Sequence, residues 1–529
     1  MSREDILTYG SDFSRKRTIH RIGLGSLVIL IGQGINVFRQ ILLVPLFLWA
    51  WGSQLYGEWL TLYAVVAYLY ILDFGMQMYV VNRLNQCYSL KQLKEYTAIL
   101  HSALLLYVGI AIAAACFITI AAFVVPIERW LNFKLLGHSI AAVVAVLLAI
   151  QLIFLIPQGL IIGLYRTFGE LPRGAMLVNI QQLAILVLTG LTLIIRGNIV
   201  HIAAVQLVPL LAITCFVLYD LKKRHPEIAI GLNKSNWRLA FTYLVPSSLF
   251  FLIQVANGFT FQGSIIVVSI FAGSTYVAVF VVHRTLTFLI RQILGSFNSV
   301  IWPELTTLEA QGDYNRLRVI HKSFVKLTFA VCVFAGIWLH FAGKDIIELW
   351  TLGKITFDQR LLDVLLLYLV FQTPWLASSV FPAAFNKHRN LAVCYILSAV
   401  LGVALSIVLV QHMGVVGVAA GLLIADVLIC GWFVPLDTCR IIGESFRKYW
   451  MEVVVRGLPI IMVLWGIGWF LHQFELQPIL SILATGSGLA LVGIGLGYSF
   501  WLSSIERVQV LSVGTALWNE VVSFNSRRL

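Results

Sequence analysis

Long apolar runs separated by short polar segments dominate the pattern of this chain. Each run is long enough to cross a hydrocarbon core as a helix, which takes about 20 residues. We predict about fourteen such spans. They cover residues 23–49, 59–81, 97–125, 139–163, 174–195, 199–219, 239–271, 276–300, 327–342, 363–384, 391–410, 415–435, 457–472 and 479–502. Because every polar segment is short, we expect no appended soluble domain.

The basic side chains lie almost entirely in alternate connections between these spans. One set of connections includes Arg17, Arg83, Lys94, Arg166, Arg173, Lys222, Arg224, Arg316, Lys322, Lys387, Arg440, Arg447 and Arg507. The other set holds only Arg129, Lys134, Arg196, Lys344, Lys354 and Arg360. Basic loops resist translocation and stay in the cytoplasm. Both termini are therefore predicted to face the cytoplasm.

Composition agrees with a polytopic all-α membrane protein. The chain is 60% hydrophobic and 12% charged, and its mean hydropathy is +0.90. The net charge of +13 belongs to cytoplasmic loops beside anionic lipid, so it does not indicate a nucleic-acid partner. The cysteines show no metal-ligand spacing. We therefore expect no metal and no cofactor.

The sequence also repeats itself. One constant offset relates Gln33, Asn36, Phe38, Gly52 and Ser53 to Gln254, Asn257, Phe259, Gly273 and Ser274. An even number of spans separates the copies, which predicts parallel repeats about an axis along the membrane normal. We expect an N-terminal lobe of six spans (residues 1–220), a second six-span lobe (221–435) and an appended segment (436–529). That segment would hold two spans and, near 505–524, a cytoplasmic interfacial helix.

Three arginines lie inside predicted spans, at Arg39, Arg284 and Arg291. Arg284 and Arg291 are seven residues apart, so they share one helix face, and His283 lies beside them. A guanidinium is always charged and binds two phosphate oxygens at once, which indicates that the three arginines bind a phosphate or diphosphate. We predict that His283 belongs to the same binding site. The alternative is that each arginine pairs with a buried acid or caps a broken helix.

Few acidic residues lie inside the spans. Asp73 and Asp426 are candidates for coupling transport to a proton or cation, or for structural ion pairs and helix-end hydrogen bonds. Glu58, Glu304 and Asp363 lie at span ends, where we expect them to be solvated. The chain has no Walker-type phosphate loop, zinc-protease motif or nucleophile elbow. The sequence therefore predicts neither an ATPase nor another enzyme.

The chain resembles oligosaccharide flippases of the Wzx type, in the polysaccharide-transporter branch of the multidrug/oligosaccharidyl-lipid/polysaccharide exporter superfamily. The resemblance covers nearly the whole length and rests on Pro45 and on the segments 51–59 (WGSQLYGEW), 72–75 (LDFG), 81–83 (VNR), 302–305 (WPEL) and 312–313 (GD). It implies alternating access between two six-helix lobes in a bacterial cytoplasmic membrane. The implied substrate is an undecaprenyl-diphosphate-linked oligosaccharide for O-antigen, lipopolysaccharide or another surface polysaccharide. Implied partners are membrane lipids, a polymerase and a chain-length regulator.

Three other functions compete with this interpretation. A cation-coupled multidrug exporter of the same superfamily would need acidic residues in its cavity, but the first span carries Arg39. A lipid II flippase would share a cationic cavity, but its early Arg-Asp motif is absent from this sequence. An integral-membrane glycan polymerase or ligase would need a large periplasmic loop, and residues 343–362 are too short for one.

Overall fold

The computed structural model of the chain describes residues 3–474, 477–497 and 499. The described residues are almost entirely helical and contain no strand. Twelve of their helices are long and apolar enough to cross a membrane, and α19 (Pro478–Leu496) is a shorter apolar helix. The chain is thus a polytopic all-α membrane protein, as predicted. The predicted interfacial helix near 505–524 lies outside the described residues.

The helices form two compact units. Unit 1 comprises residues 1–285, 350–356 and 395–421, and unit 2 comprises residues 286–349, 357–394 and 422–529. The division passes through α11 (Ser274–Gln311), α14 (Arg389–Met413) and α15 (Val415–Leu428). The lobe boundaries predicted at residues 220 and 435 remain a prediction.

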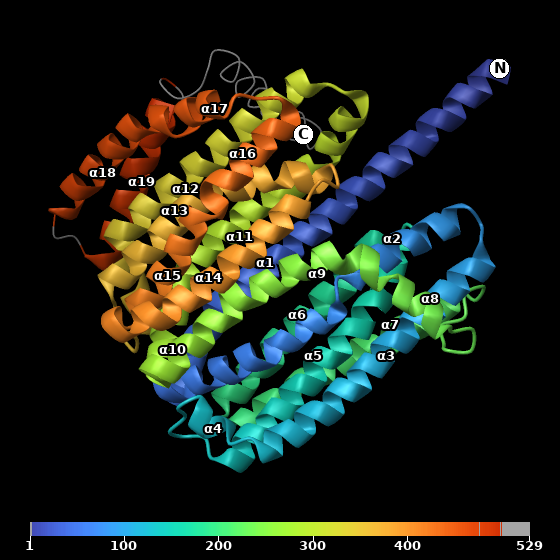
Figure 1. Cartoon of the computed structure of the whole chain (residues 1–529), viewed down its shortest axis with the longest axis horizontal. Helices are drawn as coiled ribbons and strands as arrows, with labels where there is room; N and C mark the ends of the chain where they lie inside the picture. Colours follow the sequence, from blue (N-terminus) through green and yellow to red (C-terminus); the bar gives the residue numbers. More distant parts are fainter. Residues whose placement is uncertain (1–2, 475–476, 498, 500–529) are drawn as a thin grey trace, which may run out of the picture. The chain divides into compact units, whose positions relative to one another are not determined.

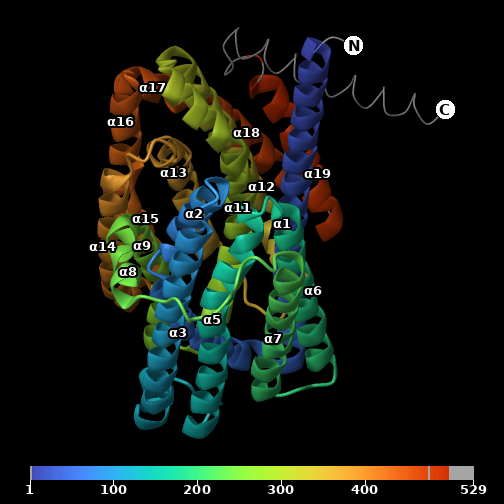
Figure 2. The ribbon, with the colours of Figure 1, turned by 90° about the vertical axis from the view of Figure 1, so that its right-hand side faces the viewer.

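Unit 1 contains the first half of the chain (Figure 1). Its other elements are α1 (Arg3–Ala67), η1 (Tyr68–Asp73), α2 (Met76–Ser89), α3 (Leu93–Val124), α4 (Ile127–Trp130), α5 (His138–Thr167), α6 (Leu171–Ile194), α7 (Ile199–Arg224), α8 (Trp237–Thr242), α9 (Leu244–Gly258), the π-helical turn η2 (Phe259–Gly263) and α10 (Ser264–Ala272). α5 packs against α2, α3 and α7, and α6 packs against α7 and α1 (Figure 2). The core of this bundle is apolar and includes Leu84, Leu100, Leu160 and Val217.

Unit 2 contains the later helices. They are the second part of α11, α12 (Tyr314–Thr351), α13 (Gln359–Ala384), α16 (Cys430–Ile442), α17 (Phe446–Val453), the short turn η3 (Val455–Gly457), α18 (Leu458–His472) and α19. α13 packs against α16, and α18 packs against α19. α12 begins well before the predicted span at 327–342, so Lys322 and Lys326 are helical residues and not part of a loop.

The first two predicted spans are joined by a bend at one residue, not by a loop. α1 continues to Ala67 through Gly52, whose backbone angles (φ 71°, ψ 178°) are accessible essentially to glycine alone. Gly273, at the matching position of the repeat, has nearly the same angles (φ 91°, ψ 167°) and separates α10 from α11. This shared conformation favours the predicted repeat.

Residues on both sides of Gly52 hold the bend through contacts of their side chains. Phe47 stacks on Tyr56 with ring centroids 5.1 Å apart, and Trp51 donates a hydrogen bond to the Gly197 carbonyl. The carboxylate of Glu58 accepts hydrogen bonds of 2.8–2.9 Å from the backbone N–H groups of residues 134–136. Glu58 is fully buried, so the expectation that it is solvated was wrong. The N–H group of Leu136 is buried and needs an acceptor, which this carboxylate supplies.

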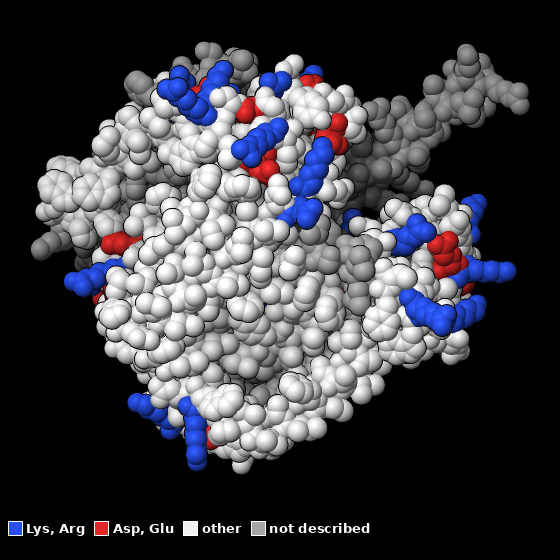
Figure 3. Space-filling model, in the orientation of Figure 1, with Lys and Arg blue, Asp and Glu red and all other residues white. Residues whose placement is uncertain are grey.

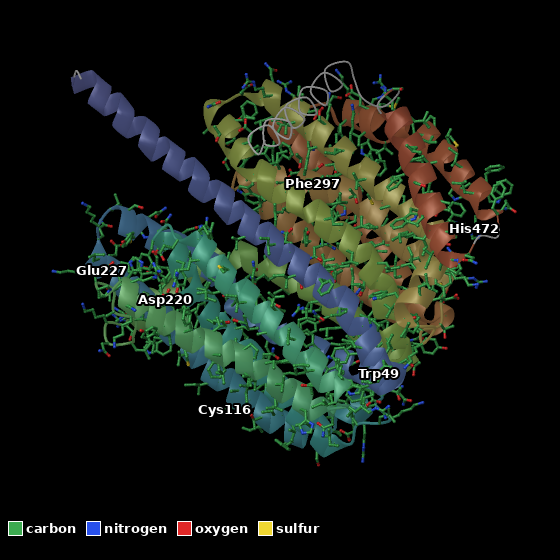
Figure 4. The ribbon with its side chains drawn as sticks, turned by 180° about the vertical axis from the view of Figure 1, so that it is seen from behind. Trp49, Cys116, Asp220, Glu227, Phe297 and His472 are labelled. Atoms are coloured by element: carbon green, nitrogen blue, oxygen red, sulfur yellow. The ribbon has the colours of Figure 1, made fainter. Side chains whose placement is uncertain are left out.

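On the face drawn in Figure 3, the charged side chains gather in separate groups, and a broad surface of uncharged residues lies between them. Within unit 1, Trp49 lies at the opposite end of the bundle from Asp220 and Glu227 (Figure 4). At the latter end, Arg173 binds Asp220 through two hydrogen bonds of 2.7 and 2.8 Å. This end of the bundle carries some of the basic connections that are predicted to face the cytoplasm.

Candidate functional site

Asp73 lies at a break in the second predicted span. Phe74 and Gly75 both adopt left-handed backbone angles (φ 51° and 67°), which end η1 and let α2 start in a new direction. The Asp73 side chain is buried, and its Oδ1 accepts a 2.8 Å hydrogen bond from the Tyr107 hydroxyl. Gln254 Nε2 lies 3.5 Å from Oδ2. Neutral donors therefore hold Asp73, and the described residues place no basic side chain within ion-pair distance of it.

A cavity of about 800 Å³ lies beside Asp73, within unit 1. η1, α2, α5, α6 and α9 contribute its walls. Its polar lining is dominated by uncharged amides and hydroxyls, at Tyr70, Gln77, Gln158, Tyr165, Gln181, Gln182 and Gln254. Asp73 and Arg166 are the charged residues of the lining. The volume falls in the roughly 300–1,000 Å³ range of small-molecule binding pockets.

Glycines on α5 allow this wall to form. A Cβ atom on Gly159 would lie 2.7 Å from Gln77 Oε1, and one on Gly163 would lie 2.6 Å from a methyl carbon of Val81. α5 can therefore approach α2 closely only because these residues lack side chains. The close approach holds the Gln77 amide against the α5 backbone at the edge of the cavity.

Arg284 contacts the π-helical turn η2. Its Nη1 donates hydrogen bonds of 2.9 Å to the Phe261 carbonyl and to the Ser264 hydroxyl. Its guanidinium carbon lies 5.2 Å from the Phe280 ring centroid and 5.7 Å from that of Phe261. A π-turn releases backbone carbonyls from the regular helical pattern, and one of them accepts from Arg284. The alternative of helix capping therefore has geometric support at this residue.

Arg291 and His283 lie on the same helix, α11. Arg291 is half-buried, and its Nη1 donates a 2.9 Å hydrogen bond to Gln372 Oε1, while Gln372 Nε2 donates to Tyr368. His283 is fully buried, and its Nδ1 lies 2.8 Å from the Val279 carbonyl one turn earlier. One nitrogen of His283 is thus engaged by its own helix. Arg291 belongs to unit 2, and Arg284 and His283 belong to unit 1.

Arg39 lies inside the first membrane-spanning helix. Its Nη2 donates a 3.0 Å hydrogen bond to Asn36 Oδ1, and the residue is half-buried. Throughout the described chain, no carboxylate lies within ion-pair distance of this guanidinium. An arginine at membrane depth costs about 2.5–3.5 kcal/mol or more on insertion scales, so it normally faces a partner or an aqueous cavity.

Asp426 is the buried acid of unit 2. It is nearly fully buried within the helical span of residues 415–442, and its Oδ2 accepts a 2.6 Å hydrogen bond from Trp375 Nε1 of α13. The indole N–H is a neutral donor to the carboxyl group. Asp73 and Asp426 therefore lie in different units, each bonded to an aromatic side chain.

A cluster of polar side chains surrounds His321 in unit 2. His321 Nδ1 lies 3.1 Å from Glu444 Oε2, its Nε2 lies 3.0 Å from the Ser378 hydroxyl, and Lys322 pairs with Glu444 at 3.1 Å. The donor atoms of His321, Cys439 and Glu444 lie within 4.8 Å of one another, which is close enough for a metal ion. However, both nitrogens of His321 and the Glu444 carboxylate already bind protein groups. This cluster is a hydrogen-bonded ion-pair network joining α12, α13 and the segment before α17.

The glutamines that line the cavity were not singled out from the sequence. Five amides inside otherwise apolar spans are a usable signal, because a polar side chain at membrane depth usually faces a partner or a cavity. The sequence could not show that α2, α5, α6 and α9 bring them together.

The chain is similar in fold to solved transporters. A lipid II flippase, MurJ, in an inward closed conformation matches 90% of this chain and 98% of its own, with 14% identity and a TM-score of 0.68. A multidrug resistance transporter of the MATE family, in the inward-facing conformation, matches 82% of this chain and 99% of its own, with 17% identity and a TM-score of 0.62. A third structure is a MOP superfamily transporter from Pyrococcus furiosus, titled for the reverse polarity of its binding pocket; it matches 80% of this chain and 95% of its own, with 16% identity and a TM-score of 0.58.

No protein-family model matches the chain, and no curated protein matches it in sequence. At identities of 14–17% the structural likeness establishes the fold alone. The chain has the fold of the MOP (multidrug/oligosaccharidyl-lipid/polysaccharide exporter) superfamily. The sequence resemblance implied this fold.

Proposed function

We propose that this protein is a flippase for an undecaprenyl-diphosphate-linked oligosaccharide. It would carry the glycan from the cytoplasmic to the outer leaflet of a bacterial cytoplasmic membrane by alternating access. Arg39, Arg284 and Arg291 would bind the diphosphate, with His283 beside them, and Asp73 or Asp426 would couple transport to an ion gradient. Surface polysaccharide assembly, including O-antigen synthesis, would use the product, and the polymerase and chain-length regulator of that assembly would be its partners.

The observation that carries the proposal is the environment of Arg39. Arg39 lies within a membrane-spanning helix and is half-buried, and its guanidinium has Asn36 as a hydrogen-bond partner in the described chain. A diphosphate would supply the missing counter-charge through paired hydrogen bonds to the guanidinium. A cationic drug would instead add like charge. This difference is why a multidrug exporter is the less favoured alternative.

The fold gives independent support. The structures similar to this chain include a lipid II flippase and multidrug transporters. A protein with this fold is thus known to transport a lipid-linked substrate. A role as a glycan polymerase or ligase is therefore less favoured. The short connections between spans agree with this, because such enzymes would need a large extramembrane loop.

The test is transport of a fluorescent undecaprenyl-diphosphate-linked oligosaccharide in proteoliposomes. Arg39→Ala should lower the transport rate about tenfold or more, because the phosphate loses a charge-assisted hydrogen bond worth about 1.5–3 kcal/mol. Arg39→Lys should restore part of the rate, since an ammonium keeps the charge but not the planar fork. Arg129→Ala is the matched control, because the Arg129 side chain is 83% exposed in a connection. A wild-type rate in Arg39→Ala would contradict the proposal.

A further inference from the structure

We propose that the glutamine-lined cavity of unit 1 is the binding site for the neutral sugar rings of the substrate, separate from the arginines that bind its diphosphate. This inference rests on the proposed function and assigns the glycan to particular residues. The cavity is the space of about 800 Å³ beside Asp73, and its lining belongs to unit 1 throughout.

The first argument is the pairing of amide groups inside the cavity wall. Gln158 Nε2 donates a 2.8 Å hydrogen bond to Gln181 Oε1 and lies 3.3 Å from the Leu210 carbonyl. Both glutamines are nearly fully buried. Such a pair fixes the orientation of both amides, so the site is organised before a ligand enters.

The second argument is a pair of buried acceptors that the protein leaves unused. Gln182 Oε1 and Gln254 Oε1 both belong to the cavity lining, are inaccessible to solvent and have no hydrogen-bond partner in the described structure. A buried polar atom without a partner costs about 1–3 kcal/mol. Rotation of either side chain toward the cavity would bring its oxygen within reach of a hydrogen-bond donor there, which would remove this cost.

The third argument is the balance of charge and chemistry. The polar side chains of the lining are one carboxylate (Asp73), one guanidinium (Arg166) and otherwise neutral amides and hydroxyls, and the remaining lining residues are apolar. A sugar ring presents several hydroxyls, each of which can donate to an amide oxygen and accept from an amide or phenol. A diphosphate can only accept, so it cannot satisfy Gln182 Oε1 or Gln254 Oε1. The cavity therefore fits neutral sugar hydroxyls better than phosphate.

Three side chains at the cavity wall, those of Tyr107, Asp73 and Gln254, are linked by polar contacts. Tyr107 donates to Asp73, and Gln254 Nε2 lies next to the other Asp73 oxygen. Asp73 thereby holds the Gln254 amide so that its Oε1 is left for a ligand. Asp73 is thus assigned a positioning role toward the sugar site.

The experiment compares two radiolabelled probes binding to the full chain in lipid nanodiscs. One probe is sugar-free undecaprenyl diphosphate, and the other is the same lipid carrying a neutral oligosaccharide. The variants are Gln182→Met, Gln254→Met and their combination, because methionine keeps the side-chain length but removes the amide. Gln206→Met is the matched control, since Gln206 is a buried glutamine of the same unit that bonds Thr189 and does not line the cavity.

We expect the double variant to bind the glycan-bearing lipid at least about tenfold more weakly, and to bind sugar-free lipid as the wild type does. Ala175→Phe, which puts a ring into the cavity from α6 and leaves every glutamine in place, should show the same selectivity, because Ala175 belongs to the lining. Gln206→Met should change neither affinity. Thermal unfolding of each variant shows that it is folded.

Two results would overturn the inference. Unchanged affinity for the glycan-bearing lipid in both the double variant and Ala175→Phe would place the sugars elsewhere and leave the flippase proposal intact. An equal loss for both probes would show that the cavity serves the lipid diphosphate instead. Failure of the wild type to bind either probe is a separate outcome, because it would contradict the proposed function itself.

Discussion

Trp375 donates a 2.6 Å hydrogen bond from its indole N–H to the carboxylate of Asp426, and both side chains are almost fully buried. An asparagine at position 426 would keep an oxygen for this bond but could not take up a proton. If Asp426 couples transport to a proton gradient, Asp426→Asn should slow uphill transport and remove its pH dependence. Binding of the lipid diphosphate should change little, because the arginines hold it.

The measurements for this prediction are thermal stability and pH-dependent transport on the same variant. Asp426→Leu is the companion, because it leaves the Trp375 N–H without its acceptor and should lower stability by about 1–3 kcal/mol. A strong loss of stability in Asp426→Asn would indicate a structural ion pair instead. Wild-type stability with an unchanged pH profile would exclude both roles.

The arginines of α11 are expected to be essential for transport. Arg284→Ala and Arg291→Ala should each abolish glycan transport while expression stays normal, since each removes a bidentate phosphate donor. Gln372→Leu is the control for Arg291, because it removes the acceptor at 2.9 Å and keeps the charge. It should reduce transport less than Arg291→Ala does. Full transport in both alanine variants would assign these arginines to structural roles.

Glu58 should be a stability residue. In Glu58→Ala, the N–H groups of residues 134–136 lose their acceptor. The N–H group of Leu136 is buried, and leaving it unpaired costs about 1–3 kcal/mol. The variant should give a markedly lower unfolding temperature or little folded protein. Glu58→Gln should lose less, because its amide oxygen still accepts. Glu304→Ala, at an exposed span-end position, should unfold like the wild type.

The bend at Gly52 should not tolerate a side chain. Alanine at φ 71°, ψ 178° is strained, so Gly52→Ala should destabilise the fold by on the order of 1–3 kcal/mol. Gly273→Ala should behave in the same way. Gly34→Ala on the same α1 helix is the matched control, because a Cβ there meets no atom within 4 Å. Thermal unfolding in detergent would show this control as neutral or slightly more stable.

His388, in the turn between α13 and α14, should make stability depend on pH. Burial lowers the pKa of His388 from its ordinary value, because the charged ring loses its hydration. The unfolded chain therefore binds more protons in mild acid, and stability falls as the pH drops from about 6.5 through the lower folded-state pKa. In His388→Gln, the unfolding temperature should depend less on pH in this range than it does in the wild type. His412→Gln, at an exposed position, should leave the wild-type slope unchanged.

The sequence by itself determined the class of this protein and the location of most of its apolar helices. Insertion depends on the local apolar content of about 20 residues, so most predicted spans coincide with one long apolar helix, although the first two share α1 and the second is broken at Asp73. The bends at Gly52 and Gly75 were not predicted, although both glycines lie in segments that carry the family resemblance. The basic residues of alternate connections predict orientation in the same local way.

Only the tertiary structure decided which polar residues meet. Glu58 looks like a solvated span end in the sequence, yet it binds a loop that begins 76 residues later. Gln158 and Gln181 meet across α5 and α6, and Gln254 reaches Asp73 from α9, 181 residues further along the chain. These contacts depend on how helices pack side by side, and glycines such as Gly159 set that packing. The hydropathy of a segment depends on that segment alone. Which polar side chains become hydrogen-bond partners depends on how several helices pack together.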